Sequence, residues 1–124
     1  MGMLEKMNLP KSCVLWRDPE SAVSGPSQEG FERLETFLDE SHWWRYLLKC
    51  RECGQLYVFE FKEEVDWVDG DDPQSCTWIP VETDEEVHRA KTTAPRNLRT
   101  IKPHLCDDRP KGGERKVYWV AAGG

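Results

Sequence analysis

The sequence predicts an α+β domain in which an antiparallel sheet of three to four strands packs against one N-terminal helix. Three observations predict this class. Apolar residues recur at helical spacing in residues 28–40, aromatic and aliphatic residues gather in short runs within residues 43–81, and turns containing glycine, aspartate or proline separate these runs. The chain has 124 residues, the size of one domain, so we expect a single domain over residues 1–124.

The N-terminal part is expected to contain the helix. Residues 1–27 are expected to be irregular, because prolines and glycine interrupt any periodicity. In residues 28–40 the apolar side chains fall on one helical face, and Ser27 can cap the helix. This face is formed by Phe31, Leu34, Phe37 and Leu38.

Antiparallel strands are expected over residues 43–81. Residues 43–48 and 55–61 predict two strands of a central hairpin, joined by a short turn that contains glycine. Residues 77–81 predict a third strand. Pro80 places it at an edge of the sheet, because proline has no N–H to donate to a neighbouring strand.

Residues 82–124 predict a short helix, a basic segment that contains prolines, and a final strand. The helix is expected from Asp84 to about Thr92. Thr83 and Glu86 have the spacing of a capping box, in which each side chain binds a free backbone N–H at the start of the helix. Residues 116–120 predict the last strand.

The charge is distributed unevenly along the chain. Residues 50–88 hold twelve acidic and two basic residues, whereas residues 89–124 hold three acidic and nine basic residues. The net charge is −6 and the sequence pI is about 5.1. An acidic surface steers basic proteins toward itself and repels nucleic acid. We therefore expect a basic partner protein and consider nucleic acid unfavoured, with the basic segment packing against the acidic middle.

Aromatic residues lie among the carboxylates of the acidic run. Such a pattern is typical of an interface with an aromatic anchor inside a charged rim. A solvated acidic face is an equally good interpretation. On the first interpretation the partner-binding residues are Glu63, Glu64, Asp66, Trp67, Asp69, Asp71 and Asp72.

The segment Cys50–Gly54 has the pattern Cys-x-x-Cys-Gly. Two residues between the thiolates allow both sulfurs to reach one tetrahedral zinc ion, and the glycine lets backbone N–H groups turn toward them. This segment resembles a zinc knuckle of zinc ribbons and rubredoxin-like folds. A hairpin turn with two half-buried thiols is the alternative. A redox site is disfavoured, because the motif lies between strands and not at the start of a helix.

A structural zinc site needs four ligands, and the chain holds no second Cys-x-x-Cys pair. His104 and Cys106 are the best choice for the other two ligands. Cys76 and His42 are the substitutes. The predicted zinc site is therefore Cys50, Cys53, His104 and Cys106.

Known catalytic motifs are missing from the sequence, so we expect no enzyme; an open zinc site would be the one exception. No window is apolar enough to cross a membrane and the N-terminus has no export signal, which predicts a cytoplasmic protein with reduced cysteines. In being short, acidic and rich in aromatic residues, the chain is similar to bacterial toxin-immunity proteins. That resemblance implies an inhibitor that blocks a basic, nucleic-acid-acting toxin. A zinc-ribbon-like module that binds nucleic acid or joins a transcription assembly is the alternative.

Overall fold

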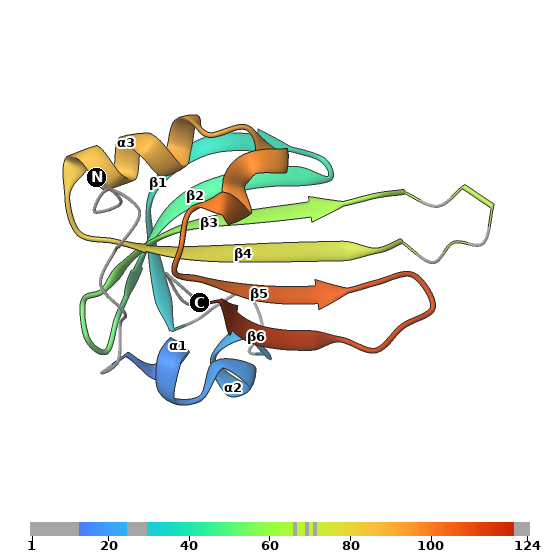
Figure 1. Cartoon of the computed structure of the whole chain (residues 1–124), viewed down its shortest axis with the longest axis horizontal. Helices are drawn as coiled ribbons and strands as arrows, with labels where there is room; N and C mark the ends of the chain where they lie inside the picture. Colours follow the sequence, from blue (N-terminus) through green and yellow to red (C-terminus); the bar gives the residue numbers. More distant parts are fainter. Residues whose placement is uncertain (1–12, 25–29, 66, 69, 71, 121–124) are drawn as a thin grey trace.

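Six antiparallel strands form one sheet, in which each strand pairs with the next along the chain (Figure 1). The computed structural model describes residues 13–24, 30–65, 67–68, 70 and 72–120. The elements are α1 (Val14–Arg17), α2 (Pro19–Ser24), β1 (Phe31–Glu40), β2 (Trp43–Cys50), β3 (Leu56–Glu63), β4 (Gln74–Val81), α3 (Asp84–Thr92), the 3-10 helix η3 (Pro95–Thr100), β5 (His104–Arg109) and β6 (Lys116–Val120). The expected α+β class is confirmed.

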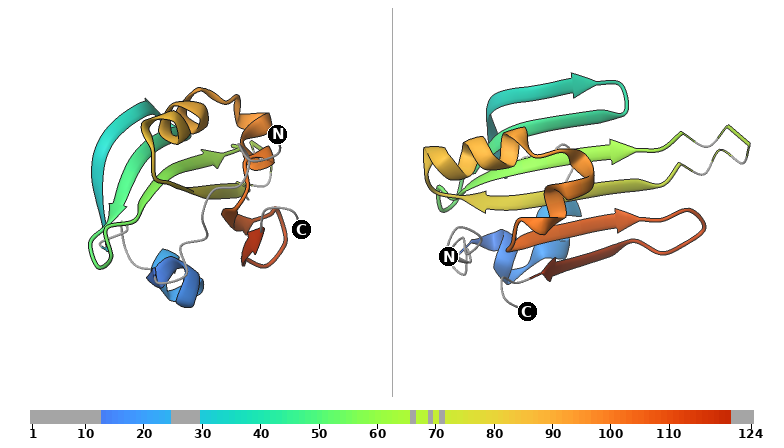
Figure 2. Two further views of the ribbon diagram at one scale, coloured as in Figure 1. Left: turned by 60° about the vertical axis from the view of Figure 1, so that its left-hand side comes forward. Right: turned by 45° about the horizontal axis from the view of Figure 1, so that its top comes forward.

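Helices cover both faces of the sheet (Figure 2). Helices α1 and α2 pack on one face, and α3 and η3 pack on the other. The buried core of the α1 face is formed by Cys13, Leu15, Phe31, Leu48, Cys50, Tyr57, Phe59, Trp78 and Leu105. The buried core of the α3 face is formed by Val58, Ile79, Val81, Ala90, Leu98 and Ile101. The sheet is therefore a layer between two small cores.

The alternation of side chains along β3 follows directly from this arrangement. Tyr57 and Phe59 lie in the core of the α1 face, whereas Val58 between them lies in the core of the α3 face. All three are at most 2% exposed. A strand that is buried on both faces needs large apolar side chains on both sides, which explains why residues 55–61 are so rich in them.

The helix expected over residues 28–40 is wrong, because residues 31–40 form strand β1. Ser27 and residues 28–29 lie outside the described residues. The pairing of β1 with β2 shifts register between Arg33 and Glu35 and again between Thr36 and Leu38. Each shift inserts an extra residue and breaks the alternation of period two. The apolar residues are therefore spaced by three and four positions, which imitates a helix.

Three other features differ from the expectation. The sheet has six strands, because β1 and β5 join the four expected ones. Within the N-terminal segment expected to be irregular, residues 14–17 and 19–24 are short helices. Strand β4 lies between β3 and β5 and is not an edge strand. Its pairing with β5 ends at Trp78, however, so Pro80 lies where β4 is paired with β3 alone.

The predictions for α3 and β6 are confirmed. Helix α3 spans Asp84–Thr92, and the Glu86 backbone N–H donates to the Thr83 hydroxyl at 3.2 Å. The Glu86 carboxylate in turn accepts from the Thr83 backbone N–H at 3.2 Å, which completes the capping box. Strand β6 covers residues 116–120 as expected. No helix among the described residues is long and apolar enough to cross a membrane.

Candidate metal centre

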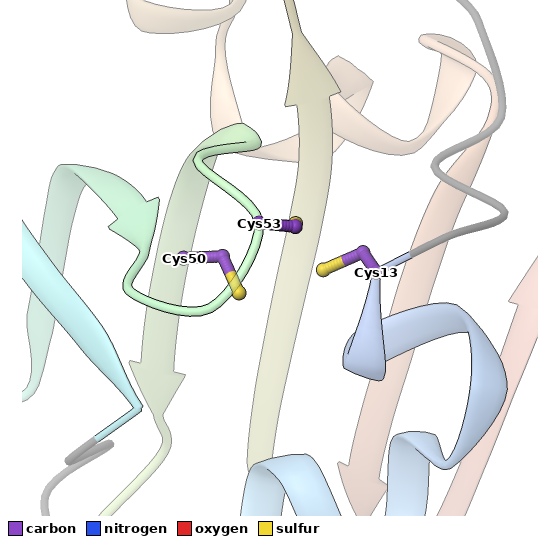
Figure 3. Close-up of side chains that lie close together, drawn as sticks. All are labelled: Cys13, Cys50 and Cys53. Atoms are coloured by element: carbon purple, nitrogen blue, oxygen red, sulfur yellow. The ribbon is translucent and has the colours of Figure 1, made fainter.

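Three cysteine side chains meet at the end of the sheet where β2 turns into β3 (Figure 3). Cys50 ends β2, Cys53 lies in the turn, and Cys13 directly precedes α1. Their sulfur atoms all lie within 4.8 Å of one another. Cys13 and Cys50 are each 1% exposed, whereas Cys53 faces solvent. The three sulfurs can therefore hold one metal ion between the turn and the N-terminal helix.

The turn from Cys50 to Gly54 has the backbone of a metal-binding knuckle. Gly54 has a φ of +84°, a conformation that glycine adopts without strain, and its N–H donates to the Cys50 carbonyl oxygen at 2.8 Å. Burial alone would raise the pKa of the Cys50 thiol. Hydrogen bonds from the backbone N–H groups of Cys53 and Glu52, together with contacts to the Cys53 and Cys13 side chains, outweigh burial, and the pKa is lowered. The turn therefore favours the thiolate form that metals bind.

Cys13 reaches this turn because α1 is fixed on the sheet. The neighbouring Leu15 is fully buried in the core of the α1 face, and its carbonyl oxygen accepts a hydrogen bond from the Trp119 indole at 3.0 Å. Arg17 forms an ion pair with Glu52 of the turn. These contacts hold the Cys13 side chain against the knuckle before any ion is bound.

Burial raises the pKa of the Cys13 thiol to about 12, although contact with the Tyr57 hydroxyl lowers it in part. Without a metal Cys13 is thus a neutral thiol at neutral pH. A bound cation would displace its proton, since metals bind the thiolate. Among the described residues this group offers three ligand atoms, so a tetrahedral ion takes its fourth ligand from outside the group.

The structure does not bring His104 and Cys106 to Cys50 and Cys53. Leu105 lies in the same core as Cys50, on the α1 face. Its two neighbours on β5 therefore point to the opposite face of the sheet. On that face His104 Nδ1 lies 2.8 Å from the Ile101 carbonyl oxygen. The side chains of His104 and Cys106 are both buried. The sheet itself separates the two expected ligand pairs.

The two substitute ligands also lie elsewhere. Cys76 pairs with Phe61 toward the β3–β4 end of these strands, away from the knuckle. His42 lies in the β1–β2 turn, where its Nδ1 is 2.8 Å from the Glu63 carboxylate. Sequence reasoning missed Cys13, which lies about 37 positions before Cys50. The one signal for it was an unassigned cysteine next to an apolar segment.

The predicted partner-binding residues that the structure describes lie at the opposite end of β3. Asp66, Asp69 and Asp71 are outside the described residues. Trp67 is 90% exposed, and the adjacent Val68 is 89% exposed. These are the largest exposures among the large apolar side chains that the structure describes.

The remaining members of this set differ in their surroundings. Glu63 accepts a hydrogen bond from Gln74 at 2.8 Å and contacts His42, and these contacts lower its pKa. Glu64 is exposed. Asp72 is half-buried, and its carbonyl oxygen accepts a hydrogen bond from Arg109. Glu63 thus stabilises the hairpin, and the exposed part of the set begins at Glu64.

Comparisons of this chain with protein-family models, with curated proteins and with solved structures found no match.

Proposed function

We propose that this protein is a zinc-stabilised protein-binding domain, with the metal at one end of β3 and the binding loop at the other. The nearly full exposure of Trp67 is the observation that carries the binding function. An exposed aromatic side chain inside a charged rim is typical of the anchor of a protein interface. The metal centre supports the fold that presents this loop.

Zinc is the metal that the donor set favours. Soft thiolate ligands select zinc and copper(I), and zinc sites built on cysteine are common structural centres. A Zn–S bond of about 2.3 Å places two sulfurs of a tetrahedral site about 3.8 Å apart. Sulfurs that already lie within 4.8 Å of one another need to approach by at most about 1 Å. The geometry is therefore close to that of a loaded site.

The ion would tie the N-terminal segment to the sheet. Cys13 belongs to the segment that carries α1, whereas Cys50 and Cys53 belong to the β2–β3 hairpin. One zinc would join these two parts of the chain across about 37 positions. Because such a site is not formed in the unfolded chain, its binding free energy adds to the free energy of folding.

Elemental analysis of protein purified without chelator tests the zinc site. We expect about one zinc per chain, and less than a tenth of that in Cys13→Ser and Cys50→Ser. Cys76→Ser and Cys106→Ser serve as matched controls and should keep the metal. Zinc-free wild-type protein, or zinc that is lost equally in the control variants, would contradict the proposal.

The binding loop is acidic as well as aromatic. Residues 63–72 contain six acidic residues and no basic residue. In the view of Figure 1 the β3–β4 hairpin extends past the β1–β2 and β5–β6 turns. A projecting acidic loop with an exposed indole fits a basic concave surface, such as the active-site cleft of an enzyme that acts on nucleic acid. We propose that this chain is an immunity-type inhibitor that blocks such a toxin in the cytoplasm.

Binding to the protein encoded beside this chain's gene tests that function. We expect that protein to be basic and to bind this chain in biolayer interferometry. The Trp67→Ala variant should dissociate from it at least about tenfold faster than wild type. A triple variant should mainly have a lower association rate, because charges at the rim of an interface speed the first encounter of the two proteins. It combines Asp69→Asn, Asp71→Asn and Asp72→Asn.

A triple variant with the same charge change on β1 is the control for the acidic loop. It combines Glu32→Gln, Glu35→Gln and Glu40→Gln, three exposed residues of the edge strand. This control should associate at close to the wild-type rate. Equal slowing by both triple variants would mean that net charge, and not the loop, drives association. Binding of nucleic acid in place of a basic protein would favour the zinc-ribbon-like alternative.

A further inference from the structure

The Tyr57 hydroxyl is a buried polar group without a hydrogen-bond partner among the described residues. Tyr57 is 0% exposed. Its ring is fixed by two edge-on aromatic contacts, with Phe31 at 6.0 Å and Trp78 at 6.1 Å between ring centroids. The side chain therefore cannot turn its hydroxyl toward water. An unsatisfied hydroxyl in such a place is unusual and calls for a physical reason.

The neighbours of this hydroxyl are the three cysteines of the metal centre. Tyr57 packs in the same buried core as Cys13 and Cys50. A neutral thiol sulfur is a weak acceptor. A metal-bound thiolate carries negative charge and accepts a hydrogen bond much more strongly. A metal-bound sulfur in this core would therefore supply the acceptor that the buried hydroxyl lacks.

Resting on the zinc site proposed above, we propose that Tyr57 donates an O–H···S hydrogen bond to the metal-bound Cys13 sulfur. Metal ligands are commonly oriented and tuned by such groups behind them, and removal of one typically costs 10- to 100-fold in metal affinity. Tyr57 would thereby stabilise the zinc-bound form of the centre relative to the zinc-free form. A tyrosine that merely fills the core would have no such effect on the metal.

The variant Tyr57→Phe tests this, because it removes the hydroxyl and keeps the ring. Zinc affinity is measured by competition with a chromophoric chelator at fixed pH. We expect Tyr57→Phe to bind zinc about 10- to 100-fold more weakly than wild type. Its metal-free form should be at least as stable as that of wild type, because an unsatisfied buried hydroxyl is lost.

Tyr118→Phe is the matched control. The Tyr118 hydroxyl contacts Asp108 at 3.3 Å on β5, far from the knuckle in the sheet order, so its removal should leave zinc affinity unchanged. With cobalt(II) in place of zinc, the sulfur-to-metal charge-transfer band of Tyr57→Phe should move to lower energy.

Two contrary results can be told apart. Equal zinc affinity of Tyr57→Phe and wild type would overturn this hydrogen bond and leave the zinc site standing. Wild-type protein that binds no zinc would overturn the metal centre itself, and this inference with it.

Discussion

The buried Arg45 side chain joins the sheet to the C-terminal end of α3. Its guanidinium donates to the Glu60 carboxylate at 2.5 and 3.2 Å, and both side chains are 5% exposed. It also donates, at 2.8 to 3.2 Å, to the carbonyl oxygens of Ala90, Lys91 and Thr93. These carbonyls belong to the last turn and end of the helix, where no N–H of the helix itself is available. One side chain thus satisfies a buried carboxylate and a helix terminus together.

Arg45→Met keeps much of the side-chain volume but removes every one of these donors. The Glu60 carboxylate would stay buried, and the Trp43 indole N–H at 2.8 Å would still donate to it. Breaking a buried ion pair in this way costs about 3–5 kcal/mol. That is a large share of the roughly 5–15 kcal/mol by which a domain of this kind is stable.

Urea unfolding followed by tryptophan fluorescence measures this loss. The double variant Arg45→Met/Glu60→Leu removes the uncompensated charge as well and should recover much of the stability. A loss below about 1 kcal/mol in the single variant would refute the reasoning. A double variant as unstable as the single one would show that the helix carbonyls, and not the charge, decide the cost.

Three further outcomes follow from individual side chains. Burial lowers the pKa of His104 below its unfolded value of 6.5. The neutral imidazole therefore contributes to stability above pH 6.5, and this contribution is lost as the pH falls below 6.5. His104→Gln should flatten this part of the curve of unfolding free energy against pH. Trp67→Ala should change the unfolding free energy of the free protein by less than about 0.5 kcal/mol, since the side chain is 90% exposed. Thr83→Ala should cost about 1 kcal/mol in thermal or urea unfolding, because it removes the capping box.

The sequence pattern predicted those elements whose stabilising contacts lie close together along the chain. The hairpin of β2 and β3 has tight cross-strand pairing and a turn fixed by Gly54, so a short window contains all the information. Helix α3 was predicted for the same reason, since the capping box of Thr83 and Glu86 lies within four residues. Strand β1 was mistaken for a helix because its two register shifts change the spacing of its apolar residues.

Strand β5 was not predicted, because the prolines on either side of it favour an irregular segment. Asp108 is paired with Arg99 at 2.7 Å and Asp107 with Arg115 at 2.7 Å, so the strand is stabilised by partners outside its own segment. These pairs also explain why part of the basic C-terminal segment is neutralised within the fold.

Only half of the candidate metal centre could be predicted from the sequence. The spacing of Cys50 and Cys53 is a local feature, and the structure places both in the expected turn. The choice of the remaining ligands depended on which face of the sheet each candidate occupies. Alternation along β5 sends His104 and Cys106 away from the knuckle, and the docking of α1 brings Cys13 to it. Topology, which the sequence pattern does not contain, decided both.

The stability of the protein with and without its metal tests the account most directly. Because the unfolded chain does not form the site, free zinc at about 1,000 times its Kd stabilises the folded protein by about 4 kcal/mol. Wild-type protein should therefore lose about 4 kcal/mol of unfolding free energy when a strong chelator removes zinc, and zinc should restore it. Cys13→Ala should be equally stable with and without the chelator. A wild-type protein whose urea unfolding curve is the same with zinc and with chelator would contradict the account.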